Sequence, residues 1–193
     1  LARDGELLRL YAAAGGRYAF IGFESLSEAN LAAINKQWGN LREYGAAIRR
    51  LHAAGINILG SFIFGLDDDD PGIFRRTLEF VTTHGIDAAQ YHILTPFPGT
   101  RLYTTLAAAG RITERDWSRY HTSEVVFIPR GMSVDELQQG YYWAFRETYA
   151  WRRIARRVLR RPQGMLFRLA MNISYRRKAQ RMPAPPPETA AAS

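Results

Sequence analysis

The chain has 193 residues, enough to bury a sizeable core, and contains no cysteine. Disulfide frameworks, thiolate catalysis and cysteine-ligated zinc or iron–sulfur sites are therefore excluded within it. The formal net charge of +8 arises at one end, because the residues from Arg146 onward hold 12 Lys and Arg against two Glu, whereas the preceding residues hold 14 against 16 acidic ones.

Three segments have the pattern of buried strands that break at their carboxyl ends into glycine or proline and polar residues. Their apolar cores are 18–23, 56–64 and 89–94, and amphipathic helical patterns separate them. This alternation favours an α/β fold with a parallel sheet and helices packed outside it. Ligands of such folds bind beyond the carboxyl ends of the strands, so the polar breaks predict the functional edge of the sheet. The full segments are 18–25 (YAFIGFES), 57–70 (NILGSFIFGLDDDD) and 90–100 (QYHILTPFPGT).

Apolar residues at helical spacing predict the helices of the first 110 residues. Ser27 has the position of an N-cap, and the apolar stripe after it runs through Leu31, Ile34 and Trp38 to Gly39. The predicted helices span about 6–14, 27–39, 41–54, 71–83 and 100–109.

The β/α alternation stops after Gly110, and the residues that follow are polar and aromatic before a helical pattern returns. A capping box of Ser133 with Glu136 marks the start of a long helix, which Pro162 breaks. The expected elements are a short strand at 124–128, helices over 133–161 and 165–181, and a disordered Pro/Ala tail. The expected parts of the chain are 1–110, an α-rich region 111–182 and the tail 183–193.

Glu24 and Ser25 end the first strand with a carboxylate and a hydroxyl over the edge of the sheet. Such a pair suits an amine or ribose hydroxyl groups, and the alternative is that both residues cap the following helix. His92 lies inside the third strand, either as a core histidine or as a ligand-binding one. We interpret Asp67–Asp70 as a solvated turn rather than a metal site, because consecutive carboxylates converge poorly on one ion. The sequence contains no phosphate-binding loop, nucleophile elbow or catalytic triad.

Five motifs follow one another along the chain: FIGFES at 20–25, Asn35-Lys36, GSFIFGLDDDD at 60–70, YHILTPFPGTRLY at 91–103 and GRITERDWSRY at 110–120. Over about residues 1–149 this set resembles the second half of a radical S-adenosylmethionine enzyme. More narrowly, it resembles the subgroup that carries an N-terminal cobalamin-binding domain and a C-terminal accessory domain, which includes the hopanoid methylases. The resemblance implies the C-terminal half of a partial (β/α)6 radical S-adenosylmethionine barrel, followed by an α-rich accessory domain.

The resemblance also implies which residues bind S-adenosylmethionine. Glu24 and Ser25 would hold its methionine or ribose part, and Lys36 would approach the methionine carboxylate. The second and third strands would flank adenine, largely through backbone and apolar contacts. Their residues in these positions are Phe64, Leu66, His92 and Leu94.

The family's CxxxCxxC loop, which binds a [4Fe–4S] cluster, and its cobalamin domain are not in this sequence. We therefore expect either a fragment that is inactive alone, with the ligands of both cofactors elsewhere in an intact parent, or a degenerate relic. The parent would methylate or rearrange an unactivated carbon of a small molecule or lipid, with methylcobalamin as the methyl donor. Two alternatives are a non-catalytic binding or scaffold module of the same fold and an unrelated aldolase-like barrel. The aldolase-like barrel is disfavoured, because no lysine that could form a Schiff base stands at a strand end.

The basic segment 151–181 places Trp151, Ile154 and Val158 on one side of a helix among arginines, and a second apolar patch follows at 165–169. A cationic amphipathic segment of this kind fits the surface of an anionic membrane. The alternative is a helix that packs on the barrel or on acidic surface of domains outside this chain. Nucleic acid is not an expected partner, because no stacking platform accompanies the charge. With no apolar run near the roughly 20 residues of a membrane span and no signal-peptide pattern, we expect a cytoplasmic protein, with peripheral membrane contact left open.

Overall fold

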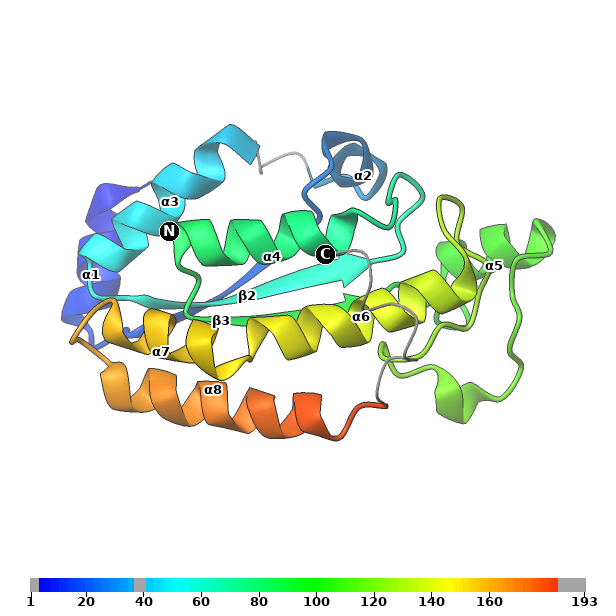
Figure 1. The fold of residues 1–193 in the computed structure, drawn as a ribbon. Coiled ribbons are helices and arrows are strands. Elements are labelled where there is room, and N and C mark those ends of the chain that lie inside the picture. Colours follow the sequence, from blue (N-terminus) through cyan, green and yellow to red (C-terminus); the bar gives the residue numbers. More distant parts are fainter. Residues whose placement is uncertain (1–3, 37–40, 184–193) are drawn as a thin grey trace.

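Three parallel strands form the central sheet of the computed structural model, which describes residues 4–36 and 41–183 (Figure 1). They are β1 (Tyr18–Glu24), β2 (Asn57–Phe64) and β3 (Ala88–Ile93), with β2 in the middle. Each predicted strand core agrees with the observed strand to within one residue at either end. The predicted α/β arrangement with a parallel sheet is therefore confirmed, and the partial barrel stays a prediction.

The first five helices alternate with these strands. They are α1 (Gly5–Ala13), α2 (Glu28–Ala33), α3 (Leu41–Ala53), α4 (Ile73–His84) and α5 (Arg101–Ala108). Ser27 caps α2 as predicted, since its Oγ accepts a hydrogen bond from the N–H of Asn30 at 3.1 Å. The helix ends earlier than predicted, because Asn35 takes a left-handed conformation with φ 55°. The predicted stripe residue Trp38 and the stop at Gly39 lie outside the described residues.

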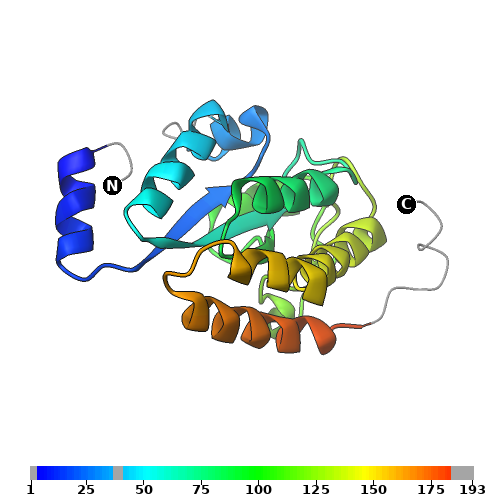
Figure 2. The ribbon, with the colours of Figure 1, turned by 60° about the vertical axis from the view of Figure 1, so that its left-hand side comes forward.

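Helices pack over the sheet (Figures 1 and 2), and aromatic side chains form much of the core between them. The rings of Phe23 and Phe62 stack with centroids 5.3 Å apart. Phe80 of α4 meets both rings edge-on. On β3, Tyr91 packs against Phe145 at a centroid distance of 5.1 Å. Because of these contacts, the face of the sheet that carries these rings is part of the hydrophobic core.

The predicted strand at 124–128 is wrong. Residues 111–130 are all described, and they form an isolated antiparallel bridge between Ile112 and Phe127 rather than a strand. Residues 125–127 are all buried, so their side chains do not alternate between core and solvent as those of a half-buried strand do. A short 3₁₀ helix, η1 (Trp117–Arg119), lies before this segment.

The described chain ends in three helices. They are α6 (Val134–Thr148), α7 (Trp151–Leu159) and α8 (Met165–Gln180). The predicted capping box of Ser133 with Glu136 starts α6, and the predicted last helix corresponds to α8. The single helix predicted over 133–161 is wrong, because the chain breaks between α6 and α7. The predicted tail from Ala184 lies outside the described residues.

Side chains of α7 and α8 stabilise the break between α6 and α7, just after Thr148. Arg157 donates a hydrogen bond to the Thr148 carbonyl at 2.8 Å, and Arg176 donates one to the Tyr149 carbonyl at 2.9 Å. These bonds satisfy carbonyl groups that a continued helix would have used. The break therefore depends on tertiary contacts, which no local sequence signal marks.

A buried polar network fastens the last helices at the amino ends of β2 and β3. The carboxylate of Asp87 accepts hydrogen bonds from the His52 ring at 3.1 Å and from the N–H of Ile58 at 2.8 Å. It also accepts one from Arg161 at 2.5 Å. Arg168 is fully buried, with its Nε 3.6 Å from Asp87, and donates to backbone carbonyls at the end of α7. Asp87 is thus the counter-charge for two arginines.

The hydrophobic core runs from α1 through the sheet to α8, and both α6 and α8 contact β3. The division of the chain at residues 110 and 182 stays a prediction. No helix in the described part of the chain is long and apolar enough to cross a membrane.

Candidate functional site

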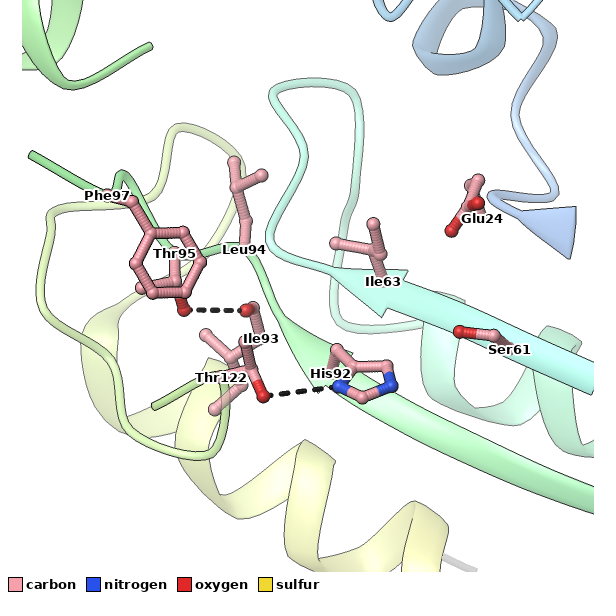
Figure 3. A pocket seen from close by; sticks show the side chains of 9 residues that line it. All are labelled: Glu24, Ser61, Ile63, His92, Ile93, Leu94, Thr95, Phe97 and Thr122. Atoms are coloured by element: carbon pink, nitrogen blue, oxygen red, sulfur yellow. Dashed lines mark hydrogen bonds between the residues drawn. The ribbon is translucent and has the colours of Figure 1, made fainter. Parts of the chain in front are cut away.

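A cavity of about 200 Å³ lies at the carboxyl ends of the three strands (Figure 3). Its walls come from the ends of all three strands, from the loop after β3 and from Thr122. Parallel strands bring their carboxyl ends to one edge, and this is the edge at which the polar breaks of the sequence fall. The lining residues are Glu24, Ser61, Ile63, His92, Ile93, Leu94, Thr95, Phe97 and Thr122.

Three of the predicted site residues line this cavity, namely Glu24, His92 and Leu94. Phe64 and Leu66 are buried and do not line it. The ring of Phe64 instead packs against an aromatic ring of α4 at a centroid distance of 4.8 Å. A role of these two residues in ligand binding, through their backbone, stays a prediction.

The predicted site residues did not include six others that line the cavity, namely Ser61, Ile63, Ile93, Thr95, Phe97 and Thr122. β2 is apolar on both faces, so its sequence does not say which alternate side chains face the cavity. Ser61 is the signal that was available, because a hydroxyl in a buried strand marks the face shared with Ile63. Thr122 belongs to an irregular segment, and no local pattern connects it with β3.

Glu24 and Lys36 form an ion pair at the edge of the cavity. The Lys36 Nζ lies 2.9 Å from the Glu24 Oε1 and also donates to the carbonyl of Gly22. The strand register shifts between Gly22 and Glu24, and Glu24 takes φ 64°. Glu24 lines the cavity, and Lys36 is not among the lining residues. The structure thus brings two of the predicted ligand-binding residues together as one charged pair.

Ser25 lies outside the cavity lining, in a buried network that joins the ends of β1 and β2. Its Oγ accepts hydrogen bonds from the N–H of Ser27 at 3.1 Å and from the Asn30 side chain at 3.4 Å. Asn30 in turn donates to Asp69 at 2.8 Å. These contacts belong to the alternative interpretation, in which Ser25 supports the start of the next helix. Its contact with a ligand stays a prediction.

His92 is held in the cavity by Thr122. The Nδ1 of His92 lies 3.2 Å from the Thr122 Oγ1, and the Thr122 carbonyl accepts from the N–H of Ile93 at 2.7 Å. Burial lowers the pKa of His92, and the charge of Lys178 lowers it further, so the ring is neutral at neutral pH. Figure 3 shows the second ring nitrogen directed away from Thr122. That nitrogen is the atom that can exchange a hydrogen bond with a ligand.

Backbone strain is concentrated around this cavity. Among the described residues, Glu24, Asn35 and Thr122 are the non-glycine residues with positive φ, and two of these three line the cavity. A non-glycine residue in the left-handed region costs about 1–3 kcal/mol, and such residues cluster at binding and catalytic sites. The strain therefore favours this cavity as the functional site.

The acidic turn Asp67–Asp70 contains one residue whose place the sequence did not reveal. Three of its members are exposed, as a solvated turn requires, but Asp69 is only 2% exposed. Its carboxylate accepts from the N–H groups of Gly65 at 2.9 Å and Leu66 at 3.1 Å. Asp69 thus fixes the loop that leaves β2 beside the cavity. The described residues contain no cluster of acidic or histidine side chains that could hold a metal ion.

We expect Asp69 to titrate near neutrality. Burial raises the pKa of Asp69 to about 6, although the hydrogen bonds from Gly65 and Leu66 oppose this rise. This pKa is higher in the folded state than in the unfolded state. The protonated Asp69 carboxyl group therefore stabilises the fold fully below the usual carboxyl range, and this stabilisation is lost as the pH rises through about 6. At neutral pH, ionisation of Asp69 then lowers the free energy of unfolding by about 3 kcal/mol. Carbon-13 NMR titration of the carboxyl group checks this directly, and a midpoint of about 4 or lower would contradict it.

Comparison with known proteins gives one family and several longer relatives. A family described as "Domain of unknown function (DUF4070)" matches residues 100–182. Bacteriochlorophyllide d C-12(1)-methyltransferase of Chlorobaculum tepidum is 33% identical over 162 residues, which cover 84% of this chain and 35% of that protein. The chain therefore spans about a third of the length of this relative.

Two further relatives have other substrates in their names. The anaerobic magnesium-protoporphyrin IX monomethyl ester cyclase of Cereibacter sphaeroides is 29% identical over 147 residues, 76% of this chain and 24% of that protein. The hopanoid C-2 methylase of Rhodopseudomonas palustris is 26% identical over 116 residues, 60% of this chain and 22% of that protein. All three similarities cover more than half of this chain.

Proposed function

The chain belongs to the cobalamin-binding radical S-adenosylmethionine enzymes, and from that membership we propose that it forms one wall of the S-adenosylmethionine site in an enzyme that methylates an unactivated carbon. The observation that carries this proposal is the Glu24–Lys36 pair beside the cavity at the carboxyl ends of the strands. The names of two relatives, a bacteriochlorophyllide methyltransferase and a hopanoid methylase, support methyl transfer as the reaction.

The residues around the cavity fit S-adenosylmethionine in their chemistry. Glu24 can accept hydrogen bonds from its amino group or ribose hydroxyls, and Lys36 places a positive charge where a methionine carboxylate can be attracted. Ile63, Leu94 and Phe97 supply apolar and aromatic surface for the adenine ring. The set thus matches both the charged and the flat parts of the molecule.

The size of the cavity supports the proposal that this chain forms only one wall of the S-adenosylmethionine site. Its volume of about 200 Å³ is below the roughly 300–1,000 Å³ of ligand sites that enclose a small molecule. In the proposal, residues outside this chain complete the site.

The described residues do not fit an iron–sulfur cluster, because the sequence has no cysteine and the described part holds no set of metal-ligating side chains. In the proposal, residues outside this chain would hold the cluster and cobalamin, which would supply an electron and a methyl group, respectively.

In the proposal, the residues of this chain bind the ligand and orient it. In the proposal, Thr122 fixes the neutral ring of His92 through Nδ1, so that Nε2 holds a polar atom of the ligand. In the proposal, Glu24, which is paired with Lys36, orients the charged part from the end of β1. Fixed donors and acceptors of this kind reduce the entropy cost of placing a reactive group.

A titration of the full 193-residue chain with S-adenosylmethionine tests the proposal. We expect saturable changes in amide NMR shifts at Gly22–Glu24, Ser61–Ile63 and His92–Thr95, because these segments line the cavity. S-adenosylhomocysteine should move the same amides, since it shares the adenosyl and amino acid parts. Saturable changes confined to another part of the chain, or none up to the solubility limit of the ligand, would contradict the proposed site.

A further inference from the structure

The amphipathic pattern is reversed in the first half of α8. Its polar residues Arg168 and Asn172 are fully buried, while Leu166 is 78% exposed and Phe167 45% exposed. A surface helix of a globular protein normally buries its apolar side and exposes its polar one. An outward apolar face of this kind indicates a partner that covers it.

The exposed apolar residues gather where α7 turns into α8. Leu159 ends α7 and is 75% exposed, and the first turns of α8 add the others. The short turn between the two helices keeps them at one end of the helix pair (Figure 1). We call this set the α7–α8 patch; it consists of Leu159, Met165, Leu166, Phe167 and Leu169.

Basic residues accompany the α7–α8 patch along the helix pair. Arg156 on α7 and Arg160 just after it are exposed near the patch, and Arg177, Lys178 and Arg181 are exposed at the other end of α8. The sequence from Thr148 to Pro183 contains no acidic residue. Arginine and lysine stems can lie along apolar material while their charged ends reach a polar surface.

The patch and the cavity lie at opposite ends of the sheet. Arg168 and Arg161, which flank the α7–α8 turn, bond to Asn57 and Asp87 at the amino ends of β2 and β3. The cavity lies at the carboxyl ends of the same strands. A partner bound at the patch therefore leaves the cavity accessible.

One part of the predicted membrane surface is wrong. Ile154 and Val158 were expected on the membrane-facing side, but they are 1% and 6% exposed and belong to the core. The apolar side of α7 therefore packs on the protein, as the alternative interpretation expects. The exposed surface is instead the α7–α8 patch.

We propose that the α7–α8 patch binds the surface of an anionic lipid bilayer. The reason for choosing a bilayer is charge complementarity. An apolar patch on a helix pair whose charged residues are all basic matches acyl chains below a layer of negative headgroups. A second copy of this chain would bring a patch of the same positive charge against it, which is unfavourable. The inference does not depend on the proposed reaction.

Co-sedimentation of the full 193-residue chain with lipid vesicles tests this inference. We expect binding to vesicles of phosphatidylcholine mixed with phosphatidylglycerol and little binding to phosphatidylcholine alone. The binding should weaken as salt is added, because exposed charges are screened. Leu166→Glu should reduce the partition onto mixed vesicles by about tenfold or more, since it removes apolar contact and adds a repelled charge. Arg177→Glu should reduce it mainly at low salt.

Ile128→Glu is the matched control, because Ile128 is also exposed but lies in the segment before α6. Its partition onto vesicles should equal that of the original chain, and circular dichroism should show that all three variants fold. A chain that stays in the supernatant with both vesicle types overturns the proposal. So does equal loss in Leu166→Glu and Ile128→Glu, or a Leu166-dependent dimer in sedimentation velocity without vesicle binding.

Discussion

Replacing Asp87 with asparagine is expected to lower the free energy of unfolding by about 3–5 kcal/mol. Asp87 is buried, and each of its partners donates a hydrogen bond to it. An asparagine would place an N–H₂ group against one of these donors and leave the fully buried Arg168 without its counter-charge. Domains are usually stable by only about 5–15 kcal/mol, so this loss would be a large part of the total.

Denaturant unfolding of the original chain and of Asp87→Asn measures this difference. The matched control is Asp70→Asn, which removes an ion pair of 2.9 Å, to Arg76, on the surface. Because that pair is exposed, the control should cost less than about 1 kcal/mol. Equal losses in the two variants would show that the buried network is not a major source of stability.

The same network should respond to acid. Burial alone raises the pKa of Asp87, but the hydrogen bond from His52 and the charge of Arg161 outweigh it and hold the pKa below its usual range. The ionised Asp87 therefore stabilises the fold above the ordinary carboxyl pKa. This stabilisation is lost as the pH falls through the folded-state pKa of Asp87. Asp69 acts in the opposite direction, since its pKa is raised. Together, the two pKa shifts predict that the free energy of unfolding is highest at a pH between the titration ranges of Asp87 and Asp69.

The strands could be predicted from the sequence because their signals are local. Each combines a run of apolar residues with a break into glycine or proline, and these features do not depend on distant contacts. The same holds for the caps at Ser27 and Ser133, where one hydroxyl satisfies backbone groups a few residues away.

The errors occur where distant side chains decide the structure. The helix predicted over 133–161 breaks because Arg157 and Arg176 satisfy its last carbonyls. The buried polar face of α8 follows from the contacts of Arg168 with Asn57, which lies far away in the sequence. Periodicity alone assigns the apolar side of such a helix to the core.

The site was only partly predictable for a related reason. Glu24 was found because a carboxylate at a strand end is conspicuous, whereas His92 was assigned to the site by the family resemblance. The side-chain phase of β2 was not readable, since Phe62, Ile63 and Phe64 are all apolar and either set of alternate residues fits a buried strand. Thr122 reaches the cavity only through the fold of an irregular segment.

Glu24→Gln is expected to weaken binding of S-adenosylmethionine to the 193-residue chain by roughly tenfold to a hundredfold. The substitution keeps the shape of the side chain and removes its charge. A lost hydrogen bond to a charged group costs about 1.5–3 kcal/mol, which corresponds to that change in affinity. The amide NMR titration gives the dissociation constant of each variant. Glu79→Gln, at an exposed position of α4, is the control and should bind as the original chain does.

The ion pair requires a second variant, because Glu24→Gln also removes the negative charge beside Lys36. The ammonium group then attracts a carboxylate more strongly, which partly offsets the loss. Lys36→Met separates the two effects when adenosine and methionine are titrated as separate probes. If Glu24 holds the ribose, Glu24→Gln weakens adenosine, whereas Lys36→Met weakens only methionine; if Glu24 holds the amino group, both variants weaken methionine. Unchanged affinity of Glu24→Gln for both probes and for S-adenosylmethionine would leave Glu24 with the structural role of closing β1 through Lys36.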